Sequence, residues 1–127
     1  MSDKREKAVA VLRGMMPSDV ADVVENPPQS SFGGELNDLA MTMVFEPLWA
    51  REQLDLRTRS LVNVAILITL RAHSELAFHG PAAIRNGATL AELEEVIYHA
   101  AGYAGFPAAV SAREAIAEAL KKAGMID

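Results

Sequence analysis

Glu75 and His79 are the two side chains of this sequence best placed for proton transfer. Residues four apart on a helix lie on the same face, so these side chains are expected to meet. Histidine gains or loses a proton near neutral pH, and a neighbouring carboxylate can fix its tautomer or stabilise the imidazolium. The same spacing also describes an ordinary surface pair worth about 0.2–0.5 kcal/mol, and spacing alone favours that plainer interpretation.

Arg57 and Arg59 fall in the first turn of a helix that is predicted to begin after Asp55. The helix dipole disfavours cations there by about 0.3–1 kcal/mol each, so a negative group is expected nearby. That group is either a protein carboxylate, Glu52 or Asp55, or an anionic ligand held by the guanidinium groups and free backbone N–H groups. The sequence leaves both alternatives open.

His99 and Tyr103 are also four residues apart on a predicted helix. Helical spacing turns His99 away from the apolar side, so it is expected to face solvent or another subunit. Tyr103 is turned away from the main apolar line, and its hydroxyl can be offered to a pocket. Either residue could line a site built between subunits.

A metal centre is a further alternative, because His73, Glu75, His79 and His99 supply the residue types of two-histidine, one-carboxylate sites. Their spacing is not diagnostic, since no third ligand stands at a fixed distance along the chain. We therefore expect no metal.

Hydrophobic periodicity predicts an all-α chain, a compact bundle of about six helices. No run alternates with period two for long enough to form a strand. A short helix is expected to begin near residue 18. The other expected helices span residues 3–16, 31–45, 55–70, 74–86, 89–104 and 107–122.

Side chains that start helices give these spans their boundaries. Ser18, Asp55 and Ser74 are predicted N-caps, and Thr89 with Glu92 forms the pattern of a capping box. The capping box predicts the start of a helix. Four apolar residues of that helix are expected to point inward: Leu90, Leu93, Ile97 and Ala101.

Proline and glycine set the other boundaries. Pro47 is predicted to end the preceding helix, which makes residues 48–54 a linker that holds Trp49. Gly87 is predicted to end a helix in the left-handed conformation. Pro81 falls inside the helix that carries His79, where it cannot donate to the carbonyl of residue 77 and is expected to bend the helix.

Length and composition exclude several classes of protein. The chain has 127 residues, a net charge of -5 and no cysteine. It fits one domain, 1–127, offers no basic surface for nucleic acid or anionic membrane, and has no thiol chemistry. The polar N-terminus precedes no apolar stretch long enough for a signal peptide or membrane span, so we expect a cytoplasmic protein.

The helix expected at residues 56–70 is apolar on nearly every side. Such a helix is either central to a bundle or pressed against a partner subunit. Met41, Met43, Phe45 and Trp49 add more apolar surface nearby. We therefore expect a homo-oligomer.

Four motifs in order give the sequence a family resemblance: LDLRTRSLV at 54–62, ELAFH at 75–79, NGATLAE at 86–92 and YAGFPAA at 103–109. Together they resemble the carboxymuconolactone decarboxylase family, over a core of residues 31–124 that follows an N-terminal helical extension of residues 1–30. The related alkylhydroperoxidase D-like peroxidases carry C-x-x-C-x-x-x-H. Here Ala72 and Glu75 stand where the cysteines would be and Ser60 where those enzymes have an acid, which excludes disulfide exchange.

The resemblance implies an all-helical subunit assembled into rings, as a hexamer or trimer. It also implies decarboxylation of a small anionic lactone, 4-carboxymuconolactone, to 3-oxoadipate enol-lactone without a cofactor. On this interpretation His79 is the general acid or a hydrogen-bond donor to the enolate, and Glu75 orients or recharges it. The substrate-binding residues are then Arg57, Arg59, Ser60, Tyr103 and His99.

Two other functions stay open from the sequence. The same acid/base pair would serve an isomerase, cyclase or dehydratase that acts on a related enolisable acid. A helical ligand-binding or assembly module without chemistry is the third possibility, because a fold does not determine a function.

Overall fold

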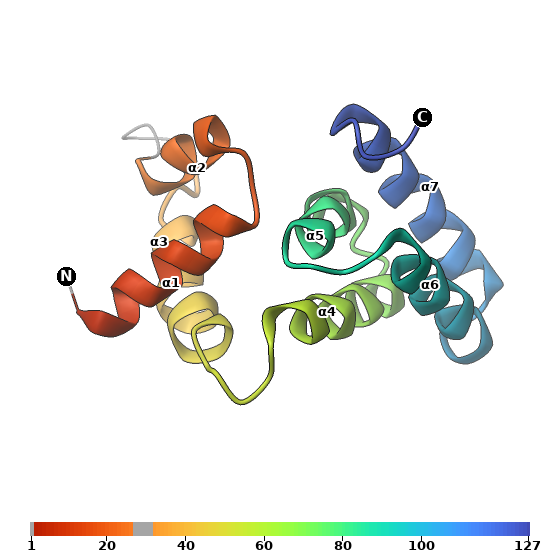
Figure 1. Cartoon of the computed structure of the whole chain (residues 1–127), viewed down its shortest axis with the longest axis horizontal. Coiled ribbons are helices and arrows are strands. Elements are labelled where there is room, and N and C mark those ends of the chain that lie inside the picture. Colours follow the sequence, from red (N-terminus) through yellow and green to blue (C-terminus); the bar gives the residue numbers. More distant parts are fainter. Residues whose placement is uncertain (1, 27–31) are drawn as a thin grey trace. The chain divides into compact units, whose positions relative to one another are not determined.

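The computed structural model describes residues 2–26 and 32–127, and every regular element in these ranges is a helix (Figure 1). The all-α prediction is confirmed. The chain divides into two compact units, Met1–Leu54 and Asp55–Asp127, which are described separately below. The predicted division into an extension of residues 1–30 and a core of 31–124 stays a prediction.

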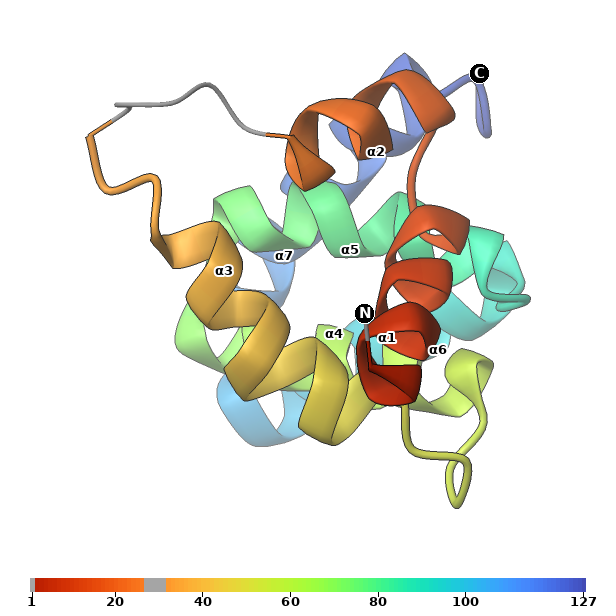
Figure 2. The ribbon, with the colours of Figure 1, turned by 90° about the vertical axis from the view of Figure 1, so that its left-hand side faces the viewer.

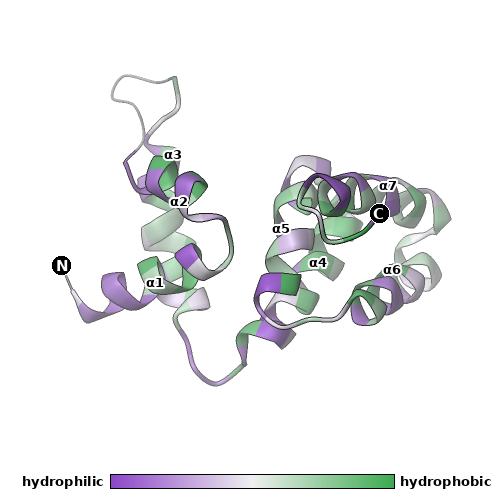
Figure 3. Ribbon diagram, turned by 45° about the horizontal axis from the view of Figure 1, so that its top comes forward, coloured by the Kyte–Doolittle hydropathy of each residue, from purple (hydrophilic) through white to green (hydrophobic). Residues whose placement is uncertain are grey.

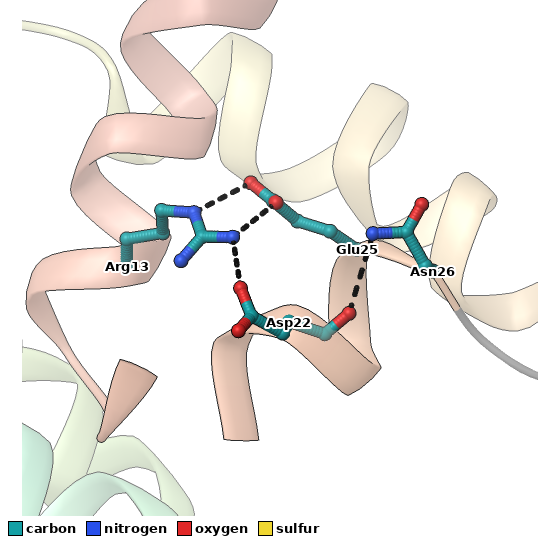
Figure 4. A network of polar contacts seen from close by, with 4 residues as sticks. All are labelled: Arg13, Asp22, Glu25 and Asn26. Atoms are coloured by element: carbon teal, nitrogen blue, oxygen red, sulfur yellow. Dashed lines mark hydrogen bonds and ion pairs between the residues drawn. The ribbon is translucent and has the colours of Figure 1, made fainter. Parts of the chain in front are cut away.

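The first unit contains α1 (Asp3–Gly14), α2 (Ser18–Glu25), α3 (Leu36–Ala40) and the π-helix η1 (Met41–Trp49). Helix α3 runs directly into η1 to form one continuous rod, and α1 packs against η1 (Figure 2). Figure 4 shows how Arg13, at the end of α1, joins α2. Its Nη2 lies 2.6 Å from Asp22 Oδ1, and its Nε donates to Glu25 Oε1 at 3.0 Å. These carboxylates raise the pKa of the guanidinium further and fix α2 to α1.

Ser18 was predicted as an N-cap, and this prediction is wrong. It is the first residue of α2, while Pro17 occupies the N-cap position with φ -60° and ψ 149° and provides no side-chain hydrogen bond. The fixed φ of proline suits this extended conformation, so the helix begins at Ser18, one residue earlier than a Ser18 cap would allow.

Pro47 does not end its helix, contrary to prediction. The helix continues through Pro47 to Trp49 in the π conformation, and the N–H of Ala50 donates to the carbonyl of Phe45, five residues earlier, at 3.0 Å. The π register widens the turn, which accommodates a residue without an N–H. Trp49 therefore lies at a helix end, where it is buried, and not in a linker. Of the helix predicted at 31–45, Ser31 lies outside the described residues.

The second unit consists of α4 (Leu56–Leu70), α5 (His73–Arg85), α6 (Leu90–Ala104) and α7 (Phe106–Lys122). Helix α4 packs against α5 and α6, and both of these pack on α7 (Figure 1). The ribbon of α7 alternates between hydrophilic and hydrophobic colour, as an amphipathic helix does (Figure 3). Helix α5 approaches α7 closely at Gly80, where an added Cβ would lie 3.0 Å from Ile116.

Most of the predicted helix boundaries in this unit are confirmed. Asp55 caps α4 by accepting from the N–H of Thr58 at 2.7 Å, and this bond lowers the pKa of the Asp55 carboxyl. Thr89 and Glu92 form the capping box of α6. Gly87 has φ +104°, as expected for a residue that ends a helix.

Three details in this unit differ from prediction. Helix α7 begins at Phe106, one residue before the predicted start at Pro107. Ser74 does not cap α5, which begins one residue earlier at His73 after Ala72. The first N–H of α5, that of His73, donates to the carbonyl of Arg71 at 3.1 Å, so the backbone of the corner satisfies this donor. On α6, Leu93 and Ile97 are buried as predicted, but Leu90 is exposed. It lies in the first turn of α6, beyond the buried part of the helix.

Helix α4 buries one face and exposes another. Ser60, Val64 and Ile68 are buried, whereas Ile66 and Leu70 are 51% and 68% exposed. The predicted helix without a polar face is thus present, and much of its apolar surface lies open. In residues 2–26 and 32–127 no helix combines the length and the hydrophobicity that crossing a bilayer requires.

Candidate active site

His79 lies on the inner margin of α5 and is only 8% exposed. Its ring and that of Phe78 form a T-shaped contact, with centroids 4.9 Å apart and an interplanar angle of 85°. Burial disfavours the imidazolium and lowers the pKa of His79 to about 4. The ring is therefore neutral at physiological pH in the protein without ligand.

Glu75 lies one turn before His79, on the same face, and its side chain is exposed. Its Oε2 is 3.6 Å from Nε2 of His79. The predicted meeting of these two side chains is thus observed, but the distance exceeds that of a hydrogen bond. Because the imidazole is neutral, the pair is a carboxylate beside a neutral ring and becomes an ion pair only when the ring gains a proton.

Ser60 is 1% exposed and lies in the part of α4 that faces the core. Its Oγ accepts a hydrogen bond from the side-chain N–H of Asn86, the C-cap residue of α5, at 2.9 Å. Asn86 was not among the predicted site residues. Its position seven residues after His79, on the same helical face, was the available signal.

Arg57 is engaged by a partner that the sequence did not suggest. Its guanidinium forms an ion pair with Glu92 of α6, and its Nε donates to Glu92 Oε1 at 3.1 Å. The predicted partner Glu52 binds Lys7 instead, and Asp55 uses its carboxylate to cap α4. The pairing joins residues 35 apart in sequence, so helix-local reasoning could not find it.

Arg59 is in a different situation from Arg57. It is half-buried, and its Nε is fully buried without a hydrogen-bond partner among residues 2–26 and 32–127. A buried N–H donor without an acceptor is costly, and an anionic ligand is one group that could satisfy it. Of the two arginines, Arg59 is the better candidate to bind a carboxylate.

His99 and Tyr103 lie at a second place in this unit. Their rings stack with centroids 5.1 Å apart and an interplanar angle of 27°. Both side chains are exposed and line an open groove of about 840 Å³ between α4 and α6. The other residues that line this groove are Leu61, Ala65, Thr69, Ala91, Glu92, Glu95, Val96, Ala100 and Ala104.

The predicted site residues thus fall into two groups. Glu75 and His79 lie together on α5, whereas His99 and Tyr103 lie along the groove between α4 and α6. Neither Glu75 nor His79 is among the residues that line this groove. The metal alternative has no geometric support, because no group of three or more His, Cys, Asp or Glu side chains within the described part of the chain could hold a metal ion.

Comparison with known proteins agrees with the motifs. The family model for the carboxymuconolactone decarboxylase family matches residues 34–118. The chain is 34% identical to a 4-carboxymuconolactone decarboxylase of Acinetobacter baylyi over 96 residues. These residues are 76% of this chain and 72% of the relative.

A second relative is a nitrosuccinic acid decarboxylase of Metarhizium robertsii. It is 40% identical over 65 residues, which are 51% of this chain and 46% of the relative. Both relatives are named as decarboxylases, so their names indicate carboxy-lyase activity. The resemblance inferred from the motifs is confirmed, and the chain belongs to the carboxymuconolactone decarboxylase family.

Proposed function

We propose that this protein is a carboxy-lyase that decarboxylates 4-carboxymuconolactone to 3-oxoadipate enol-lactone without a cofactor. The observation that carries the proposal is a buried, neutral His79 beside Glu75 in a chain related to a decarboxylase of that substrate. Loss of carbon dioxide breaks one C–C bond, and the electron pair moves through the ring double bond onto the carbonyl oxygen of the lactone. One proton then joins the carbon next to the lactone carbonyl.

The neutral imidazole suits the step in which the dienolate forms. An N–H donor held at the developing dienolate oxygen stabilises charge that is absent from the ground state. A dianionic substrate bound beside the ring raises the pKa of His79, so the same ring can also acquire a proton in the complex. Glu75, 3.6 Å away, then orients the ring or recharges it.

Arg59 is the residue proposed to bind a carboxylate of the substrate. Its buried and unpaired Nε can donate to a substrate carboxylate, whereas the guanidinium of Arg57 is held by Glu92. Ser60, which lies on α4 one residue after Arg59, is the second proposed contact. In the groove, His99 and Tyr103 remain proposed substrate contacts only if the lactone extends there or if a neighbouring subunit brings the two places together.

The substrates named for the two relatives share one chemical feature. In nitrosuccinic acid one carboxyl group shares its carbon with a nitro group, which can accept the electron pair as a nitronate. In carboxymuconolactone the acceptor is the conjugated lactone carbonyl. We therefore propose a substrate class of small polycarboxylates in which the electron pair left by the departing carboxylate can delocalise onto an electron-accepting oxygen.

The assay follows lactone absorbance and released carbon dioxide in the same sample. One carbon dioxide for each lactone consumed is the expected result, and nitrosuccinic acid serves as a parallel substrate. An absorbance change without carbon dioxide would indicate an isomerase, cyclase or dehydratase. Ligand binding without turnover would support the non-catalytic alternative and overturn the proposal.

We also propose that the chain is a homo-oligomer in the cytoplasm. The supporting observation is the exposed apolar face of α4, where Val62, Ile66 and Leu70 lie open, because contiguous apolar surface of this kind marks interaction sites. Sedimentation at micromolar concentration is expected to show trimers or hexamers. A clean monomer would contradict this part of the proposal.

A further inference from the structure

The hydrogen bond between Asn86 and Ser60 lies at the far end of the helix that carries His79. It joins the C-cap of α5 to the second turn of α4, across 26 residues of sequence, at 2.9 Å. The acceptor Ser60 is 1% exposed and the donor Asn86 is half-buried, so the acceptor end of the bond is sheltered from competing water. A sheltered hydrogen bond of this kind holds its two helices in a defined register.

Helix α5 is tied to α4 at its other end by the chain itself. Arg71 closes the corner in the left-handed conformation, with φ 56° and ψ 37°. The N–H of Ala72 donates back to the carbonyl of Leu67 at 3.0 Å, and that of His73 to Arg71 at 3.1 Å. His79 therefore lies between two attachments to α4.

The helix is weak just after His79. Pro81 has no N–H to donate to the carbonyl of Ala77, and Gly80 is a poor helix former. A larger residue than Gly80 would crowd α7, because a Cβ there would lie 3.0 Å from Ile116. Because α5 can bend at this point, His79, which borders the bend, keeps its place only when both ends of the helix are held against α4, so the attachment at the far end becomes important.

We propose that Asn86 is a positioning residue: its bond to Ser60 holds the second half of α5 against α4 and thereby fixes the place of the His79 ring. This inference rests on the proposed function for its catalytic consequence, but the position of the ring is a property of the protein alone. Asn86 lies seven residues after His79 on the same face of α5, about 10 Å along the axis, and acts through the helix.

The test uses the full chain labelled with ¹³C at histidine Cε1. The chain has three histidines, and the His79 resonance is the one that disappears in His79→Gln. Asn86→Ala and Ser60→Ala each remove the bond, the latter by deleting a single oxygen atom. Asn37→Ala is the matched control, because it truncates an exposed amide on α3.

Both test variants are expected to shift the His79 resonance and to move its titration midpoint upward, because a displaced ring gains contact with water. The double variant should add little to either shift. Asn37→Ala should leave the resonance in place. With an active enzyme, Asn86→Ala should also lower kcat by about 10- to 100-fold while KM changes less than about threefold.

An unchanged His79 resonance and titration in a folded Asn86→Ala protein would overturn the inference, even if turnover fell. If Asn86→Ala does not fold by circular dichroism, the same decision rests on Ser60→Ala. If the parent protein does not decarboxylate the lactone, the proposed function fails and the resonance of His79 still decides whether Asn86 positions it.

Discussion

Two helices of the second unit carry the same short pattern, a glutamate followed four residues later by a histidine. On α5 the pair is Glu75 and His79, and on α6 it is Glu95 and His99. His79 is buried with its pKa lowered to about 4, whereas His99 is exposed and stacks on Tyr103 along an open groove. Burial, and not the spacing of the pair, therefore distinguishes the candidate catalytic histidine from its counterpart.

Replacing each histidine in turn tests this distinction and is expected to give the largest effect. His79→Gln is expected to lower kcat/KM by about 10²- to 10⁴-fold, because the reaction loses its donor to the dienolate. His99→Gln should cost far less, and Glu118→Gln, which alters an exposed pair on α7, gives the baseline. Steady-state kinetics on the lactone measure all three. Equal losses for both histidines would place catalysis in the α4–α6 groove or between subunits.

The second prediction concerns stability and needs no substrate. The unfolded chain protonates His79 near pH 6.5 and the folded chain only near pH 4, so the unfolded state holds more protons between these values. Stability therefore rises with pH across this window, and the buried ring accounts for a loss of about 3 kcal/mol when the pH falls through it.

Urea unfolding of the parent and of His79→Gln from pH 7 to pH 4 measures this effect. The stability of the parent should fall more steeply than that of the variant. His99→Gln, which replaces an exposed histidine, is the control for the loss of a histidine as such. Parallel curves for the parent and His79→Gln would contradict the burial of His79.

The third prediction separates the two arginines at the start of α4. Arg59→Lys is expected to raise KM about tenfold, because the fork of donors that would hold a carboxylate is lost. Arg57→Lys keeps a cation beside Glu92 and should change KM much less. Initial rates at several lactone concentrations give both values. A larger effect at Arg57 would move the substrate towards α6.

The smallest expected effect concerns the corners that precede the two histidine-bearing helices. The corner before α5 places Arg71 at φ 56°, whereas the corner before α6 uses Gly87 at φ 104°. Arg71→Gly should therefore stabilise the protein by up to about 1 kcal/mol. Arg113→Gly, inside α7, should destabilise it by about 1 kcal/mol. Thermal unfolding of the two variants and the parent measures both changes in stability. A destabilised Arg71→Gly would show that the arginine side chain stabilises the protein by more than its strained backbone costs.

Local sequence signals predicted much of this fold because their physics is local. Asp55 and the Thr89–Glu92 capping box each satisfy N–H groups within one turn, and Gly87 ends its helix through its own backbone conformation. Pro47 failed as a stop signal because a π turn accommodates it, which depends on the surrounding helix.

The candidate site was predictable only in part, for a different reason. The meeting of Glu75 and His79 follows from helical spacing, but the burial of His79 depends on packing between helices that no local pattern specifies. The engagement of Arg57 by Glu92 likewise depends on how α4 packs against α6. Tertiary packing thus determines which of two similar pairs is suited to chemistry.

The central claim is that His79 acts from a sheltered, neutral state, and the pH dependence of kcat/KM tests it most directly. This quantity reports the ionisation of the free enzyme. We predict that His79 contributes no titration to it between about pH 5.5 and about pH 8, because His79 is already neutral throughout that range. A decrease in kcat/KM as the pH rises, with a midpoint near pH 6.5 and absent in His79→Gln, would contradict this claim. It would identify a solvated imidazolium as the acid.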